Sequence, residues 1–125
     1  MNLHNLTIKK FHDGLVKKEF SASEAVKAYF DVIEAKDKNI GAYLATAKDN
    51  AFLGADNVDV AIARGEEVGM LAGVPLAIKD NILIEGLQAT SASKILENYK
   101  AAYDATVIKK LKNEKAVFLG KTNMD

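Results

Sequence analysis

The first half of the chain repeats apolar residues at the spacing of amphipathic helices. Three helices are predicted in this way, over residues 8–16, residues 22 to about 36, and residues 47–63. Thr7 can cap the first helix, and Ser21 with Glu24 forms the pattern of a capping box before the second. Gly65 is placed to end the third helix in a left-handed conformation.

The second half carries short uncharged runs that predict buried strands. Residues 71–78 contain no charge, and this run indicates a strand over residues 74–79 that is buried on both faces. A helix over residues 105–112, capped by Asp104, precedes a second strand over residues 116–119. This order is typical of a βαβ unit, in which the two strands are parallel and joined by a right-handed crossover.

These patterns divide the chain into two segments. Residues 1–65 form an N-terminal helical segment with one short strand near residues 39–46, and residues 66–125 begin an α/β core. Lys79 ends the first core strand, and residues 120–123 are predicted to leave the second as a loop. Because functional groups gather at the carboxyl ends of parallel strands, both positions are candidates for a site.

The composition is that of an ordinary soluble domain and excludes several classes of function. Hydrophobic residues make up 49% and charged residues 27% of the chain, and 17 basic residues balance 17 acidic ones. A net charge of zero implies no strong field toward nucleic acid or an anionic membrane. No cysteine is present and only 2 histidines, so disulfides, thiolate nucleophiles and most zinc sites are excluded. The N-terminus lacks the pattern of a signal peptide and no long apolar stretch occurs, so we expect a cytoplasmic protein without a membrane partner.

Lys79 is the candidate catalytic residue because it follows an uncharged strand. An ammonium group in apolar surroundings loses hydration, which lowers its pKa and leaves a neutral amine that can act as a general base. Pro75 and Ala77 share its face of the strand, and these small neighbours leave room for a substrate. The alternative interpretation is a strand end that reaches solvent, with Lys79 and Asp80 as ordinary surface charges.

Three other polar groups have simpler interpretations than a site. The hydroxyl cluster of residues 90–93 is typical of a turn and helix cap, although a serine near a lysine base can also act as a nucleophile. The acidic side chains Asp56, Asp59, Glu66 and Glu67 are typical of a solvated face rather than a divalent-cation site. The run Gly-Lys-Thr at residues 120–122 is not a phosphate-binding loop, because a lysine, residue 115, stands where that motif needs its first glycine.

Three segments together closely resemble the amidase signature family. They are Pro-Leu-Ala-Ile-Lys-Asp at residues 75–80, Thr-Ser-Ala-Ser-Lys-Ile-Leu at residues 90–96, and Phe-Leu-Gly-Lys-Thr-Asn-Met-Asp at residues 118–125. Their order and spacing are, more narrowly, similar to the A subunits of the glutamine-dependent aminoacyl-tRNA amidotransferases. The resemblance covers most of residues 5–125 and implies the N-terminal part of that family's fold, a central mixed β-sheet flanked by helices.

The resemblance also implies a catalytic role. In the family the lysine of the first segment is the base of a Ser-cisSer-Lys triad, which places that role on Lys79. Both triad serines belong to a later segment rich in glycine and serine, and the serines at positions 21, 23, 91 and 93 match neither. We therefore expect the 125 residues to be an N-terminal fragment that is inactive alone. Lys115 departs from the family, which usually carries glycine there; a positive φ would cost about 1–2 kcal/mol.

For the intact protein the resemblance implies the glutamine-hydrolysing subunit of a tRNA-dependent amidotransferase. Such an enzyme converts Glu-tRNA(Gln) to Gln-tRNA(Gln), Asp-tRNA(Asn) to Asn-tRNA(Asn), or both. The implied partners are subunits B and C of a heterotrimer, glutamine as the ammonia donor, and mischarged tRNA held through the partner subunit. This chain is expected to bind no cofactor, because the partner subunit uses the ATP and Mg²⁺. Two alternatives remain, a stand-alone amidase acting on a small amide and an inactive structural fragment; residues 93–97 and 120–125 favour the tRNA-linked subunit over the amidase.

Overall fold

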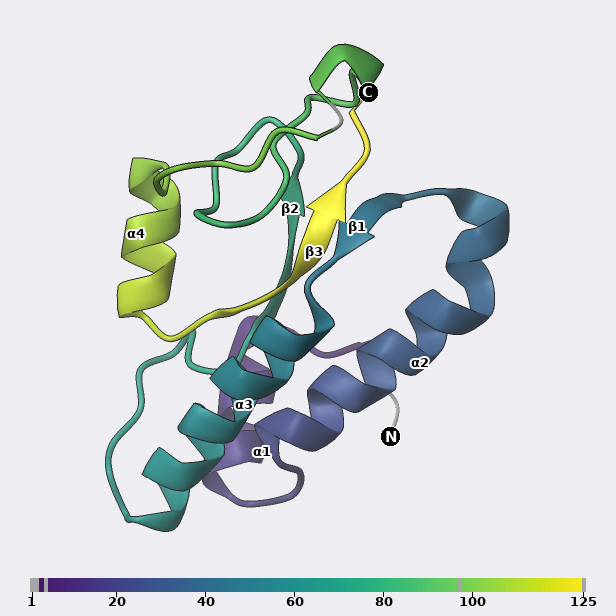
Figure 1. Cartoon of the computed structure of the whole chain (residues 1–125). Coiled ribbons are helices and arrows are strands. Elements are labelled where there is room, and N and C mark those ends of the chain that lie inside the picture. Colours follow the sequence, from purple (N-terminus) through teal and green to yellow (C-terminus); the bar gives the residue numbers. More distant parts are fainter. Residues whose placement is uncertain (1–2, 4, 97, 125) are drawn as a thin grey trace.

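The chain folds around a three-stranded sheet with helices packed about it (Figure 1). The computed structural model describes residue 3, residues 5–96 and residues 98–124. The elements in chain order are α1 (Ile8–Val16), α2 (Ala22–Ile40), β1 (Tyr43–Thr46), α3 (Lys48–Ala63), β2 (Pro75–Lys79), the short 3-10 helix η1 (Lys94–Leu96), α4 (Thr106–Asn113) and β3 (Val117–Thr122). Glu97 and Asp125, which belong to the segments compared above, lie outside the described residues.

Local hydrogen bonds set the ends of the first two helices. The Thr7 side chain accepts a hydrogen bond from the backbone N–H three residues further on, and Ser21 with Glu24 forms both hydrogen bonds of a capping box. The predicted starts of α1 and α2 are therefore confirmed. α2 continues beyond the predicted end near Lys36 because the left-handed conformation that stops it belongs to Gly41, with φ of 70°.

β3 is the central strand of the sheet, parallel to β2 and antiparallel to β1. The predicted parallel pair of the βαβ unit is therefore confirmed. The predicted loop at residues 120–123 is wrong in its first part, because Gly120, Lys121 and Thr122 continue β3 and pair with both neighbouring strands. β1 brings the N-terminal segment into the same sheet. The boundary near residue 65 itself stays a prediction.

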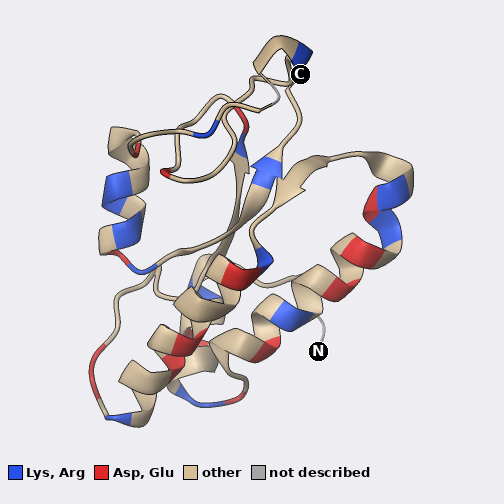
Figure 2. Ribbon diagram, viewed as in Figure 1, with Lys and Arg blue, Asp and Glu red and all other residues tan. Residues whose placement is uncertain are grey.

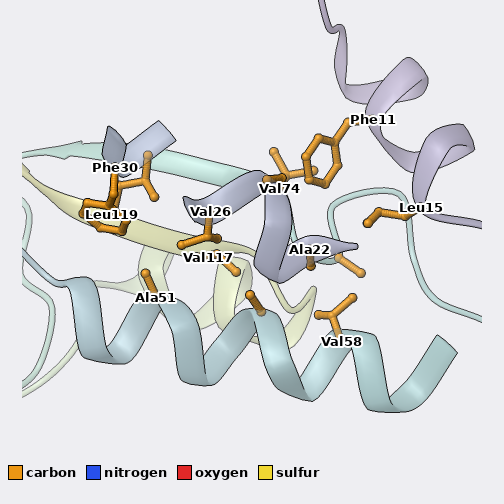
Figure 3. Close-up of a cluster of buried hydrophobic side chains, with 13 residues drawn as sticks. Phe11, Leu15, Ala22, Val26, Phe30, Ala51, Val58, Val74, Val117 and Leu119 are labelled. Carbon is orange, nitrogen blue, oxygen red and sulfur yellow. The ribbon is translucent and has the colours of Figure 1, made fainter. Parts of the chain in front are cut away.

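Two hydrophobic cores hold the helices against the sheet. The larger core joins α1, α2 and α3 to β3 (Figure 3). Its buried residues are Phe11, Leu15, Ala22, Ala25, Val26, Phe30, Ala51, Ala55, Val58, Ala72, Val74, Val117 and Leu119. A second core of Ile78, Ile84 and Ile108 packs α4 against β2 and the segment that follows it. Full burial of a side chain as large as Phe30 contributes about 1.5–3 kcal/mol, so the larger core dominates the packing of the helices.

The face of β2 that carries Lys79 is more open than predicted. Ala77 is exposed and Pro75 and Lys79 are half-buried, whereas Ile78 on the other face is buried. The reason is topological: β2 lies at the edge of the sheet, and within the described chain the buried residues of the larger core come from β3 and none from β2. Burial on both faces was therefore the wrong expectation.

Two aspartates have partners that the sequence did not predict. Asp104 is not the N-cap of α4, a position held by Ala105; it accepts a hydrogen bond from the backbone N–H of Glu85 at 2.8 Å and pairs with Lys112 at 2.8 Å. Asp59, predicted to face water, accepts hydrogen bonds at 2.7 and 3.0 Å from the first two backbone N–H groups of α2. These groups have no partner within their own helix, so the Asp59 carboxylate both caps α2 and ties it to α3.

We expect Gly120→Ala to destabilise the fold strongly. A Cβ at this position would lie 2.3 Å from the carbonyl oxygen of Ala45, so β1 and β3 would have to separate, at a cost of more than about 2 kcal/mol. Gly54→Ala is the matched control: its Cβ meets only Val117, at 3.6 Å, and alanine favours the helix by about 1 kcal/mol. Urea unfolding measures both, and equal free energies of unfolding would contradict the close approach of the strands.

Lys115→Gly should raise the free energy of unfolding. Lys115 joins α4 to β3 with φ of 64°, the conformation anticipated for this departure from the family, and glycine relieves a strain of about 1 kcal/mol there. The matched variant Lys109→Gly, on the exposed side of α4, should lower stability by about 1 kcal/mol. Thermal unfolding of the two variants should therefore shift in opposite directions, and a shift of both to lower temperature would refute the strain at Lys115.

Candidate active site

Lys79 lies at the carboxyl end of β2, where the two parallel strands end together. Its Cα pairs with that of Thr122 on β3, and its side chain is half-buried. Figure 2 shows basic positions on both of these neighbouring strands. The chain turns immediately after Lys79: the backbone N–H of Asp80 donates to the Thr122 carbonyl and that of Ile82 donates to the Lys79 carbonyl, both at 3.0 Å. The position of the Lys79 backbone is thus fixed on both sides.

The residues next to Lys79 belong to the opposite face of the sheet, because side chains alternate along a strand. Ile78 packs into the second core beneath α4, and its register partner on β3 is Lys121. Asp80, the residue after Lys79, directs its carboxylate to the same side as Lys121. Lys79 and the Asp80–Lys121 pair therefore lie on different faces of one strand end.

Lys121 and Asp80 form an ion pair in the interior. Their side chains are 1% and 0% exposed, and Nζ of Lys121 lies 3.8 Å from Oδ1 of Asp80. Lys121 also donates a hydrogen bond to the backbone carbonyl of Ile82. Oδ2 of Asp80 accepts hydrogen bonds from Gln88 Nε2 at 3.2 Å, from the Thr90 backbone N–H at 3.1 Å, and from the Thr90 hydroxyl. Oδ1 accepts none within the described chain, so Lys121 is the charge that balances it.

Burial lowers the pKa of Lys121 below its usual value of 10.5, and the attraction of Asp80 opposes part of that shift. The loss of hydration predicted for the lysine at the end of β2 is thus found one strand away. Sequence reasoning missed Lys121 because residues 120–123 were taken as a loop. The available signal was the same as for Lys79: a lysine that follows the uncharged run of residues 116–120.

The hydroxyl cluster of residues 90–93 divides into two parts. Thr90 is buried and bound to Asp80, whereas Ser91 is exposed and Ser93 is half-buried. Ser91 and Ala92 have φ of 50° and 59°, which reverses the chain before η1. The prediction of a turn is confirmed here. The role of Thr90 as a ligand of a buried carboxylate had not been predicted.

Neither cavity of the described chain is a ready-made pocket around Lys79. The larger, about 850 Å³, lies between α3 and α4 and extends along residues 66–69. The smaller, about 200 Å³, is bordered by Lys121 and Gln88 together with β1 residues. Among the described residues no group of three or more acidic or histidine side chains is arranged to hold a metal ion.

A parallel strand pair whose ends carry these lysines, joined through α4, is the class of α/β arrangement that the comparisons identify. A family model described as Amidase matches residues 24–125. The chain belongs to the amidase family.

Among its relatives are components of tRNA-dependent enzymes. The A subunit of the glutamyl-tRNA(Gln) amidotransferase of Fusobacterium nucleatum subsp. nucleatum is 48% identical over 124 residues, which are 99% of this chain and 26% of that protein. The A subunit of the same enzyme from Carboxydothermus hydrogenoformans is 50% identical over 125 residues, 100% of this chain and 26% of its own length. The chain therefore spans about a quarter of the length of these curated relatives.

Solved structures place the chain in the amidase signature fold. A bacterial aryl acylamidase of the amidase signature family superposes with a TM-score of 0.89 and 30% identity, covering 97% of this chain and 26% of that one. The native peptide amidase of Stenotrophomonas maltophilia gives a TM-score of 0.90 at 27% identity, with 97% and 25% covered. The predicted fold class, the N-terminal part of this α/β fold, is confirmed. No helix in the described parts of the chain is long and apolar enough to cross a membrane.

The buried ion pair predicts a distinctive dependence of stability on pH. Between the lowered pKa of folded Lys121 and its ordinary value of 10.5, the unfolded chain binds more protons than the folded one, so the free energy of unfolding should rise with pH. Lys121→Met should lack this rise. Burial raises the pKa values of Tyr29 and Tyr43 and lowers stability above pH 10.0 in both proteins, so the difference between wild type and variant isolates Lys121. Urea unfolding from pH 7 upward is the measurement, and parallel curves would contradict the assignment.

Proposed function

We propose that this chain is part of the glutamine-hydrolysing A subunit of a tRNA-dependent amidotransferase. The observation that carries the proposal is that two proteins of this name are 48% and 50% identical to it over almost its whole length, whereas the two amidases above are 30% and 27% identical. The reaction would supply ammonia for Gln-tRNA(Gln), Asn-tRNA(Asn) or both.

In this proposal Lys79 is the general base. A neutral amine at the end of β2 takes a proton through a bridging serine from the nucleophilic serine, which attacks the side-chain carboxamide of glutamine. Backbone N–H groups stabilise the oxyanion, ammonia leaves, and water hydrolyses the acyl-enzyme. The open face of β2 around exposed Ala77 supports this role, because a substrate and the two serines can approach Lys79 from that side. No serine of the chain matches the triad, so the mechanism requires a segment beyond these 125 residues.

The proposed assembly is a heterotrimer with subunits B and C in the cytoplasm. Ammonia passes to the partner subunit, which holds the mischarged tRNA and uses ATP and Mg²⁺ to activate the carboxylate. The zero net charge of the chain agrees with tRNA contact through the partner, since this chain carries no strong positive field of its own.

A stand-alone amidase acting on a small amide is the second candidate. The specific observation in its favour is the superposition on an aryl acylamidase and a peptide amidase with TM-scores of 0.89 and 0.90. It shares Lys79 and the same chemistry, and differs in acting without partner subunits.

Glutamate release from glutamine tests the proposal. The product of the complete open reading frame that contains this chain should be active, its Lys79→Ala variant should lose at least about 10³-fold in kcat because the base is gone, and Lys110→Ala on the exposed side of α4 should retain activity. The 125-residue chain alone should release no glutamate. Activity of that short chain would mean that its nucleophile lies within these residues and that the triad is wrong.

The same assay separates the two candidates. A component of an amidotransferase should release glutamate fastest in the presence of its partner subunits and mischarged tRNA, and should co-purify with those subunits. Turnover of simple amides by the isolated protein, with no response to the partners, would favour the stand-alone amidase.

A further inference from the structure

The turn that follows Lys79 is held by a residue on the neighbouring strand. Ile82 closes this turn by donating its backbone N–H to the Lys79 carbonyl at 3.0 Å. The carbonyl of the same residue accepts the hydrogen bond of the Lys121 ammonium group. One peptide segment is therefore bonded to Lys79 at one end and to Lys121 at the other.

The carboxylate of Asp80 extends this cluster to a third segment. Its Oδ2 accepts hydrogen bonds from Gln88 and from the backbone and hydroxyl of Thr90, which belong to the irregular segment between β2 and α4. Its Oδ1 faces Lys121, and its own backbone N–H donates to Thr122. Three segments that are distant in sequence thus meet around one buried carboxylate next to Lys79.

The cost of this arrangement suggests a role other than stability. A buried ion pair loses so much hydration that well-packed apolar side chains in its place are often as stable or more stable. At 3.8 Å the Lys121–Asp80 pair is also longer than a hydrogen bond, and Lys121 makes its short contact with a backbone carbonyl instead. What the pair provides is geometry, because each charge is bonded to backbone on a different segment.

We propose that Asp80 and Lys121 are positioning residues that fix the backbone of Lys79 from the opposite face of the sheet, so that its amine is held where the substrate side requires it. Neither residue touches the substrate in this arrangement. Its catalytic consequence rests on the function proposed above, whereas the clamp on the turn does not.

The clamp can be measured by hydrogen exchange in the product of the complete open reading frame. The amides of Asp80 and Ile82 report the two hydrogen bonds that hold the turn, and the amides of α2 report global stability. Lys121→Met removes the charge and the donor while keeping most of the side-chain volume. Thr90→Val removes the hydroxyl bonded to Asp80 at nearly constant shape, and Thr90→Ser keeps it. Lys112→Met disrupts the exposed ion pair with Asp104 and serves as the control.

We expect Lys121→Met and Thr90→Val to speed exchange at residues 80 and 82 by about tenfold or more, with α2 unchanged, because each removes a hydrogen bond to a charged group. Thr90→Ser and Lys112→Met should change it less than about twofold. If Lys121→Met unfolds the protein, the Thr90 pair decides the question. Unchanged exchange at residues 80 and 82 in both Lys121→Met and Thr90→Val, or in Thr90→Val alone if Lys121→Met does not fold, would overturn the clamp.

Glutamate release on the same variants tests the consequence for catalysis. A misplaced base should lower kcat by about 10- to 100-fold at nearly constant KM, with wild-type rates in Thr90→Ser and Lys112→Met. Faster exchange at residues 80 and 82 with an unchanged kcat would overturn the positioning role. If Lys79→Ala itself keeps full activity, the proposed function fails, while the exchange data still decide whether the cluster fixes the turn.

Discussion

The structure depends on bringing two charges into its interior at the end of the sheet. Lys121 and Asp80 are almost completely shielded from solvent, one within the paired part of β3 and the other directly after β2. An isolated charge in such a place would be very unfavourable, so each must be matched by the other and by hydrogen bonds. These are supplied by Ile82, Gln88 and Thr90, and that requirement determines the path of the chain from residue 80 to residue 90.

The surrounding sheet is arranged to accommodate this pair. Gly120 lets β1 approach the backbone of β3 closely, directly before the buried lysine. The second core beneath α4 covers the same face through Ile78 and Ile84. The opposite face, with Lys79 and exposed Ala77, remains open at the edge of the sheet. A packed face that carries the internal charges and an open face that carries the candidate base are therefore two sides of the same strand end.

Local patterns predicted most of the elements because their causes are local. The caps at Thr7 and Ser21 and the left-handed residue at Gly65, with φ of 79°, depend on a few neighbouring residues, and all three were predicted from the sequence. The parallel pairing of β2 and β3 followed from the order of strand, helix and strand.

Interactions between distant residues were not predictable in the same way. The end of β3, the burial of Lys121 and the role of Thr90 depend on Asp80 being carried to them by the tertiary fold, over separations that periodicity does not address. The same holds for Asp59, whose partners at the start of α2 lie 36 and 37 residues away. A lysine after an uncharged run was the correct signal for an internal charge, but the sequence carried that signal twice, and only the packing decides which lysine is enclosed.

Amine labelling of the native protein, followed by tryptic mass spectrometry, tests the central claim most directly. Reductive methylation for short times modifies exposed lysines first. We predict that Lys121 reacts far more slowly than Lys109 and Lys110 on the exposed side of α4, and more slowly than half-buried Lys79, until the protein is unfolded. Labelling of Lys121 at the rate of Lys109 under native conditions would mean that the charge is not enclosed, and would contradict the buried ion pair at this strand end.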